Sequence, residues 1–346
     1  MTGEIGTPLF WALLGPSVIA ATALATAAMI MLLWPLLVRY ALVQPNARSS
    51  HVVPTPQGGG IAAITAIVTV TIIAAPMVHE TVSGSFGSLS TVLAATAFLA
   101  VVGMVDDIRA VGVGTRLLLQ VLAVLAVIAA LPAELRVLPF LSWPVERVLL
   151  LLGGLWFINL VNFMDGLDWM TVAEVVPVSG GLVLLGLLGA LPPVGVLVAL
   201  AIFGAILGFA PFNRPVARLF LGDVGSLPIG VLLGWLLILL ASNGHIVAAL
   251  LLPLYYLADA TVTLCRRISS GKPVWEAHRT HFYQLATDRG FTVLEVIARV
   301  FTANLALGTL ALVSVLKPEF FISICALAVG SGIVGWLLVS FSRGKS

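Results

Sequence analysis

Acidic and amide side chains follow an apolar run in residues 159–168, whose sequence is NLVNFMDGLD. Two amides, Asn159 and Asn162, and two carboxylates, Asp165 and Asp168, lie in this short segment. Such a cluster after an apolar helix is usually a solvated turn, because aspartate caps helices and glycine ends them. Amides and carboxylates are also the oxygen ligands that hard cations prefer, so this segment is the first candidate site.

Three further polar groups stand beside apolar segments and favour a functional interpretation. Asp106 and Asp107 follow the apolar run 99–105, and Asp223 lies in the sequence FLGDVGS. The motif HRTH at residues 278–281 lies in the longest polar stretch of the chain. Charged side chains at membrane segments are costly, so their repeated presence indicates a function.

The adjacent carboxylates of Asp106 and Asp107 repel each other, so at least one of them needs a cation, a proton or an arginine nearby. Arg109 and Arg116 follow in the same loop. The pair could bind Mg²⁺, orient its water ligands or act as a base. Magnesium favours one or two carboxylates together with substrate phosphate oxygens, and Asp223 adds another carboxylate to such an incomplete shell.

Two other polar stretches could bind an anion. Gly58, Gly59 and Gly60 open a span after the loop 38–57, and they either let backbone N–H groups approach an anion or form only a flexible turn. The last polar loop could grip a diphosphate, or it could only contact anionic lipid; its two histidines favour the first alternative. A zinc site is not indicated, since no other His or Cys lies near them. The basic and imidazole residues of this loop are Arg266, Arg267, Lys272, His278, Arg279 and His281.

The composition places these residues in a membrane protein. Of 346 residues, 60% are hydrophobic and only 9% are charged, and the mean hydropathy is +1.14, values outside the range of soluble globular domains. We predict an all-α, polytopic integral membrane protein with about 11 transmembrane helices. Residues 1–346 form a single domain, and the active site is built from cytoplasmic loops. Cys265 and Cys325 lie far apart in the sequence, so no disulfide framework is expected.

The basic residues predict the orientation of the chain. Threading the spans alternately places 14 of the 17 Lys and Arg residues on or beside one side and leaves Arg136, Arg147 and Lys317 opposite, so the first side is cytoplasmic. Every candidate motif falls on that side, and Pro253 is expected to kink its span. The predicted spans are 10–37, 58–78, 89–105, 117–131, 148–163, 171–190, 194–212, 225–241, 245–264, 294–315 and 319–341.

Four ordered motifs on one membrane face resemble those of the polyprenyl-phosphate N-acetylhexosamine-1-phosphate transferases. The resemblance runs from about Arg48 to Gly290, and the joint occurrence of the motifs is specific although no single motif is. They are GMVDD at 103–107, NLVNFMDGLD at 159–168, FLGDVGS at 220–226 and HRTH at 278–281.

The resemblance implies an enzyme of the bacterial inner (cytoplasmic) membrane that transfers N-acetylhexosamine 1-phosphate from a UDP-sugar to undecaprenyl phosphate. UMP is released, and the lipid-linked product starts O-antigen or another envelope polysaccharide. The implied cofactor is Mg²⁺, with Mn²⁺ as an alternative. The implied partners are UDP-N-acetylhexosamine, undecaprenyl phosphate and the lipid bilayer, without nucleic acid; a homodimer is also considered.

The resemblance also implies roles for individual residues. The catalytic set is Asp106, Asp107 and Asp223, and the metal ligands are Asn162 and Asp223. The acceptor phosphate is assigned to Asp106 and Arg116. The donor is assigned to Asn162, Asp165, Asp168, Asn213, Phe220, Arg279 and His281.

Two positions depart from the family pattern. Trp169 stands where the family often has glycine, and we expect its ring to form a sugar-pocket wall that rejects a muramoyl-pentapeptide donor. Tyr283 and Gln284 stand where the last motif often has further histidine. The main alternative function is a cation-coupled transporter, but its carboxylates should lie near mid-membrane, where only Asp259 is expected. A catalytically inactive scaffold is disfavoured because every matched ligand is present.

Overall fold

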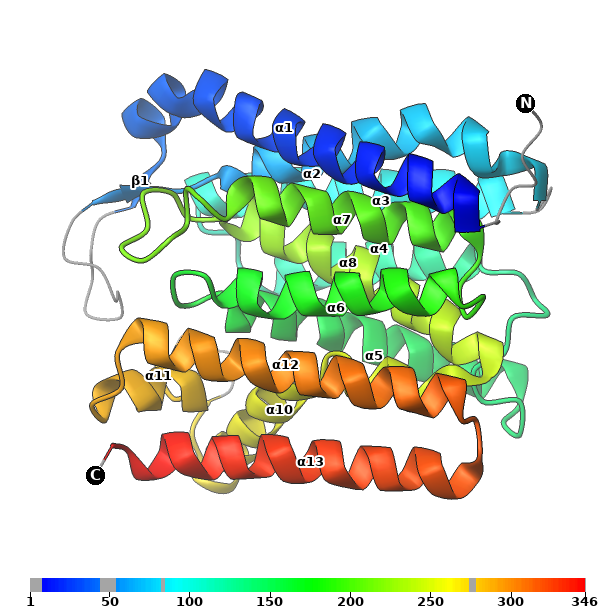
Figure 1. Ribbon diagram of the computed structural model, residues 1–346. Helices are drawn as coiled ribbons and strands as arrows, with labels where there is room; N and C mark the ends of the chain where they lie inside the picture. Colours follow the sequence, from blue (N-terminus) through cyan, green and yellow to red (C-terminus); the bar gives the residue numbers. More distant parts are fainter. Residues whose placement is uncertain (1–7, 44–53, 82–84, 274–277, 346) are drawn as a thin grey trace.

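The computed structural model describes residues 8–43, 54–81, 85–273 and 278–345, and it forms a bundle of long helices with short connections (Figure 1). The predicted all-α, multi-pass fold is confirmed: eight helices of the described residues are long and apolar enough to cross a membrane, and two more apolar helices are shorter. The helices are α1 (Pro8–Tyr40), α2 (Gly59–Ala74), α3 (Ser85–Ile108), α4 (Val113–Ala129), α5 (Trp143–Met164), α6 (Met170–Leu187), α7 (Pro193–Phe209), α8 (Asp223–Leu240), α9 (Ile246–Leu251), α10 (Leu254–Ser269), α11 (Phe282–Asp288), α12 (Val293–Leu316) and α13 (Phe320–Arg343).

Each predicted span falls on a helix, and the predicted break at Pro253 is confirmed. The ninth span is divided there, because α9 ends at Leu251 and α10 begins at Leu254. A π-helical turn, η2 (Ala241–His245), joins α8 to α9, and Gly244 in this turn has a φ of 88°. The total of eleven crossings stays a prediction.

The two chain ends lie at opposite ends of the bundle, and the C-terminus lies at the same end as α11 and the short strand β1 (Leu42–Val43) (Figure 1). This strand pairs antiparallel with β2 (Thr55–Pro56). Gln57 forms a bridge with Phe220, which ties the start of α2 to the loop before α8. The chain between β1 and β2, with His51, lies outside the described residues.

Helix α8 is the centre of the bundle. It packs against α2, α3 and α5, and 15 of its 18 residues are buried. The burial follows from its sequence, which is apolar on all sides. Asp223, the first residue of this central helix, therefore lies at the end of the most enclosed element.

Glycines bring the backbones of α2, α3 and α8 into direct contact at that end. A Cβ atom at Gly60 would lie 2.3 Å from the Cα of Gly225, and one at Gly103 would lie 2.3 Å from the carbonyl of Asp223. Gly59 and Gly60 also donate backbone hydrogen bonds to the carbonyls of Phe220 and Leu221. The glycine run that opens α2 therefore serves close packing, and an anion-binding role for it stays a prediction.

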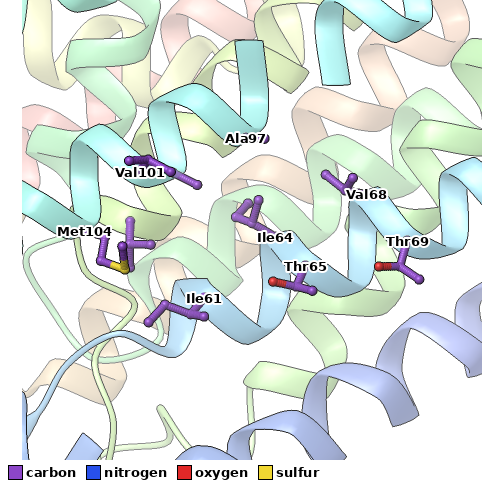
Figure 2. Close-up of a pocket in the computed structure, with 10 residues that line it drawn as sticks. Ile61, Ile64, Thr65, Val68, Thr69, Ala97, Val101 and Met104 are labelled. Carbon is purple, nitrogen blue, oxygen red and sulfur yellow. The ribbon is translucent and has the colours of Figure 1, made fainter. Parts of the chain in front are cut away.

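The outer faces of α2 and α3 are separated by an apolar groove of about 280 Å³ (Figure 2). Ile64 and Val68 of α2 lie opposite Val101 of α3 in this groove. Met104 and Val224 also line it, so it runs toward the end of the bundle where α8 begins. Its lining is suited to contact with lipid hydrocarbon.

We expect Gly60→Ala to destabilise the protein, because the added methyl group overlaps the α8 backbone, which cannot move as a flexible side chain can. Overpacking of this kind costs about 1–3 kcal/mol. Gly153→Ala is the matched control, since a Cβ at this α5 position meets nothing within 4 Å. Thermal unfolding of the two purified variants measures the difference, and equal melting temperatures would contradict the tight contact.

Candidate active site

The carboxylate of Asp107 holds the N-terminus of α8. Its Oδ1 accepts a hydrogen bond of 3.0 Å from the backbone N–H of Asp223, and its Oδ2 accepts one of 3.1 Å from Val224. A carboxylate is favoured at a helix N-terminus, where N–H groups lack partners and the dipole is positive. Gly222 allows this approach, because its φ is 79° and a Cβ there would lie 2.5 Å from the Asp107 Oδ2. Asp107 thus fixes the position of the neighbouring Asp223.

Arg116 of α4 lies between two of the predicted carboxylates. Its Nη1 is 3.0 Å from Asp106 Oδ2 and 3.5 Å from Asp223 Oδ2. Asp106 also accepts a 2.7 Å hydrogen bond from the backbone of Val111, which closes the loop between α3 and α4. The Arg116 Nε is buried without a hydrogen-bond partner among the described residues. The arginine therefore keeps donor capacity beyond the two carboxylates.

Asn162 near the end of α5 completes this group. Its Nδ2 donates to Asp223 Oδ1 at 2.8 Å and to the Ser226 hydroxyl at 2.9 Å. The assignment of its amide oxygen and nitrogen depends on these neighbours, so a cation beside Asp223 would favour the reversed amide. Three motifs far apart in the sequence thus meet at one point. We name Asp106, Asp107, Arg116, Asn162 and Asp223 the carboxylate centre.

The carboxylate centre fits a hard divalent cation. Its donors are carboxylate and amide oxygens, which suit Mg²⁺ or Mn²⁺ and not a thiophilic metal. Within the described residues, no group of three or more His, Cys, Asp and Glu side chains is arranged to enclose a metal. An ion bound by Asp223 and Asn162 would therefore take its remaining ligands from phosphate oxygens and water, which is the usual mode for Mg²⁺.

A central cavity of about 650 Å³ opens beside the carboxylate centre, and both polar and apolar side chains line it. Cavities of this size typically hold small organic ligands. Its polar lining is formed by Arg116, Asn159, Asn162, Asp165, His278, His281, Tyr283 and Gln284, and its apolar lining includes Val113, Leu117, Leu152, Leu155, Trp156 and Leu264.

Asp165 lies in this cavity with a perturbed carboxyl group. Burial, together with negative charge on Asp223, Asp107 and Asp168, raises its pKa to about 7, although a hydrogen bond from the Thr171 hydroxyl opposes the shift. A carboxylate with this pKa favours a nearby cation or hydrogen-bond donor, as expected of a binding site.

Asp168 and Asn213 hold loops in place. Asp168 is buried and accepts a 2.9 Å hydrogen bond from the backbone of Ala217, and Asn213 donates to the carbonyl of Leu219 at 2.9 Å. Neither residue, nor Phe220, is among those that line the central cavity. The hydrogen bonds of Asp168 and Asn213 therefore position loops. The donor contacts assigned to Asp168, Asn213 and Phe220 stay predictions.

Trp169 has a different environment from the predicted sugar-pocket wall. It has a φ of 60°, and its backbone N–H donates to Asn213 Oδ1 at 2.7 Å. Its indole N–H donates to the carbonyl of Ala210 at 2.7 Å, and its ring packs against the hydrophobic core. Trp169 is not among the residues lining the central cavity, so its ring anchors α6 to the loop after α7.

His281 is oriented by Asp259, a residue that the sequence analysis placed near mid-membrane. Asp259 is fully buried, and its Oδ1 lies 3.2 Å from the Nδ1 of His281. It also accepts backbone hydrogen bonds from Phe282 and Tyr283 at the start of α11. With Nδ1 facing Asp259, the Nε2 atom is left for the cavity. The sequence signal for this contact was an acidic residue in the apolar span that precedes the HRTH motif.

His278 stacks on His281, with ring centroids 5.0 Å apart. Burial, with positive charge on His281 and Arg267, lowers the pKa of His278 to about 4, so its ring is neutral at pH 7. Tyr283 and Gln284 link α11 to its surroundings: Tyr283 donates to the carbonyl of Phe163 at 3.0 Å, and Gln284 accepts from the His281 backbone.

The structure separates the basic residues of the last loop. His278 and His281 line the central cavity, whereas Arg266, Arg267 and Lys272 line a different one. Arg279 forms an ion pair of 3.4 Å with the exposed Asp288 and is not among the lining residues of either cavity. These side chains therefore do not line one shared cavity in which all of them could bind the same diphosphate.

The chain is similar to membrane phospho-sugar transferases. The model of glycosyl transferase family 4 matches residues 89–241, which contain all of the carboxylate centre. A probable undecaprenyl-phosphate N-acetylglucosaminyl 1-phosphate transferase of Bacillus subtilis is 25% identical over 70% of this chain and 68% of its own length. The decaprenyl-phosphate N-acetylglucosaminephosphotransferase of Mycobacterium leprae is 24% identical, over 75% and 73%. A phospho-N-acetylmuramoyl-pentapeptide-transferase of Bacillus licheniformis is 30% identical, over 49% and 51%.

Proposed function

We propose that the chain, which is similar to glycosyl transferase family 4 over residues 89–241, transfers N-acetylhexosamine 1-phosphate from a UDP-sugar to undecaprenyl phosphate, releasing UMP. The observation that carries the proposal is the carboxylate centre beside a cavity that both polar and apolar side chains line. Such a site suits a water-soluble donor and a lipid acceptor. The product would start O-antigen or another envelope polysaccharide.

The proposed reaction needs the two phosphate groups to be positioned and their charge neutralised, more than it needs covalent catalysis by a side chain. The attacking oxygen of a lipid phosphate is already anionic, so the main obstacle is repulsion between two phosphate groups. Mg²⁺ bound at Asp223 and Asn162 would supply positive charge at the transferred phosphate. Arg116 adds a fixed cation 3.0 Å from Asp106, and we assign both residues to the acceptor phosphate.

The acceptor chain would occupy the apolar part of the central cavity. Leu152 is 56% exposed and Leu117 is 37% exposed, so this wall continues to the outer surface of the bundle. An isoprenoid chain entering between α4 and α5 would bring its phosphate to Arg116. Burial of that chain contributes apolar contacts, while the arginine fixes the polar end.

The donor would occupy the polar part, where Asp165, His278 and His281 are available. His281 is held by Asp259, and its free nitrogen can donate to or accept from a diphosphate or sugar. Both N-acetylglucosamine and muramoyl-pentapeptide transferases occur among the relatives. The position of Trp169 outside the central cavity removes the expected basis for rejecting the peptide donor. We therefore propose an N-acetylhexosamine without specifying it.

The test of the reaction uses purified protein with undecaprenyl phosphate, Mg²⁺ and a panel of UDP-sugars, with UMP release as the readout. We expect UMP to appear only when both substrates are present, together with a lipid-linked diphospho-sugar. If the protein were instead a cation-coupled transporter, proteoliposomes would show ion flux that does not depend on a UDP-sugar. Ion flux without UMP release from any donor would overturn the proposed transferase.

The metal assignment predicts that Asp223→Asn and Asn162→Ala insert and fold normally but lose at least about 100-fold in kcat, because transition-state charge is no longer neutralised. Excess EDTA should abolish wild-type activity, and added Mg²⁺ should restore it. Asn159→Ala is the comparison on the same helix, because Asn159 bonds Gln120 at 2.7 Å and not Asp223. Activity retained in EDTA would remove the metal from the mechanism.

We also propose that the active site faces the cytoplasm of a bacterial inner membrane, on the basis of the charge asymmetry. In a background without Cys265 and Cys325, both exposed, single cysteines at Ser270 and Ser142 report the two ends of the bundle. We expect Ser270→Cys to react only with reagents that reach the cytoplasm and Ser142→Cys only from outside. Labelling of both positions from one face would refute this orientation.

A further inference from the structure

A second polar cavity, of about 180 Å³, lies between the end of α10 and α11. It shares no lining residue with the central cavity. Helix α11 separates the two: His281, Tyr283 and Gln284 line the central cavity, whereas Leu285 and Arg289 line the second. The second cavity is therefore a site apart from the proposed catalytic chemistry.

The lining of the second cavity is strongly basic. Four cations converge on it, and within the described residues none of its lining side chains is acidic. Three hydroxyl side chains add hydrogen-bonding capacity. Cations gathered in a small space repel one another unless an anion lies between them, and guanidinium and ammonium groups match phosphate oxygens well. The cations are Arg266, Arg267, Lys272 and Arg289, and the hydroxyls are Thr263, Ser270 and Thr280.

Arg267 shows that this cavity is built into the fold. The residue is only 8% exposed, and its Nη2 donates to the carbonyl of Pro273. Its Nε is buried without a hydrogen-bond partner among the described residues. Arg267 shares this lining with three other cations and has no carboxylate partner among the described residues. A buried guanidinium in such surroundings is costly, and a bound anion would relieve that cost.

The surroundings of the cavity identify the anion. Val262 is 40% exposed and Ile268 is 60% exposed, and both lie on α10 beside the lining residues. Helix α10 is the second half of the predicted ninth span, and apolar side chains exposed next to a basic cavity at the end of such a span are typical of the level where lipid head groups lie. We propose that this cavity binds a phosphate group, supplied by the head group of an anionic phospholipid or by free phosphate.

A phosphate in this cavity would also act on α11. It would contact Arg266 and Arg267 of α10 and, across the cavity, Arg289 at the end of α11. Thr280, which bonds the Nδ1 of His278 at 3.0 Å, lies in the same lining. Bound phosphate would hold the segment that carries His278 and His281 against α10.

The test measures binding and not transfer, so its outcome is independent of the proposed reaction. Full-length protein is placed in phosphatidylcholine nanodiscs with and without phosphatidylglycerol, and in detergent with inorganic phosphate or with chloride at equal ionic strength. Melting temperature and retained lipid are recorded. We expect the melting temperature to rise with phosphatidylglycerol, with phosphate or with both.

The double variant Lys272→Gln/Arg289→Gln removes two exposed cations and leaves the buried Arg267 in place. We expect it to bind at least about tenfold more weakly and to lose the rise. Arg343→Gln removes a charge in the last turn of α13, outside the cavity lining, and should keep the rise.

A rise with phosphatidylglycerol alone identifies a lipid head group, and a rise with inorganic phosphate identifies free phosphate as sufficient. The site would be refuted by the absence of a rise in both arms. An equal rise in the double variant, or an equal loss in Arg343→Gln, would refute it as well, because general surface charge would then explain the effect.

Discussion

The carboxylate of Asp107 at the N-terminus of α8 is the interaction on which the site depends. It accepts two backbone hydrogen bonds from Asp223 and Val224, and these orient the first turn of the most buried helix. Glycine contacts between α2, α3 and α8 bring the backbones close enough for this. Because backbone contacts fix the position of Asp223, little conformational entropy is lost when this residue binds a ligand. Asp107 thus acts first as a positioning residue, whatever it contributes to the reaction.

A few side chains that form several hydrogen bonds each satisfy the buried polar groups of the bundle. Asp259 is the clearest example, since it accepts from Tyr255, Thr263, His281 and the first turn of α11. An ionised carboxylate in an apolar bundle is tolerated only when such donors replace its water. The same contacts orient a histidine toward the central cavity. Fold and site therefore share one interaction here, and a change at Asp259 would affect both.

Much of this could be predicted from the sequence. The all-α membrane class and the order of the spans follow from long apolar runs, which have few structural alternatives. The meeting of Asp106, Asn162 and Asp223 was expected because their motifs share one side of the membrane. The separation of Arg266 from His281 was not, since helical phase and the path of α11 depend on tertiary packing. The contact of Trp169 was not expected either, since its indole N–H donates to the carbonyl of Ala210 at the end of α7.

The separated arginines give the segment that carries His278 and α11 two faces with different electrostatics. Toward the central cavity it presents His278, whose pKa is lowered to about 4, and the Asp259-bound His281. Toward α10 it presents Arg289 opposite Arg266, where positive charge is permanent. In the proposed reaction a diphosphate donor would be attracted at short range mainly by Arg116 and by a cation at the carboxylate centre, while the permanent charge of the loop would act at a separate site. Because the two faces are separate, the basic side chains that set the membrane orientation would not compete with a cation at the carboxylate centre for the same phosphate groups.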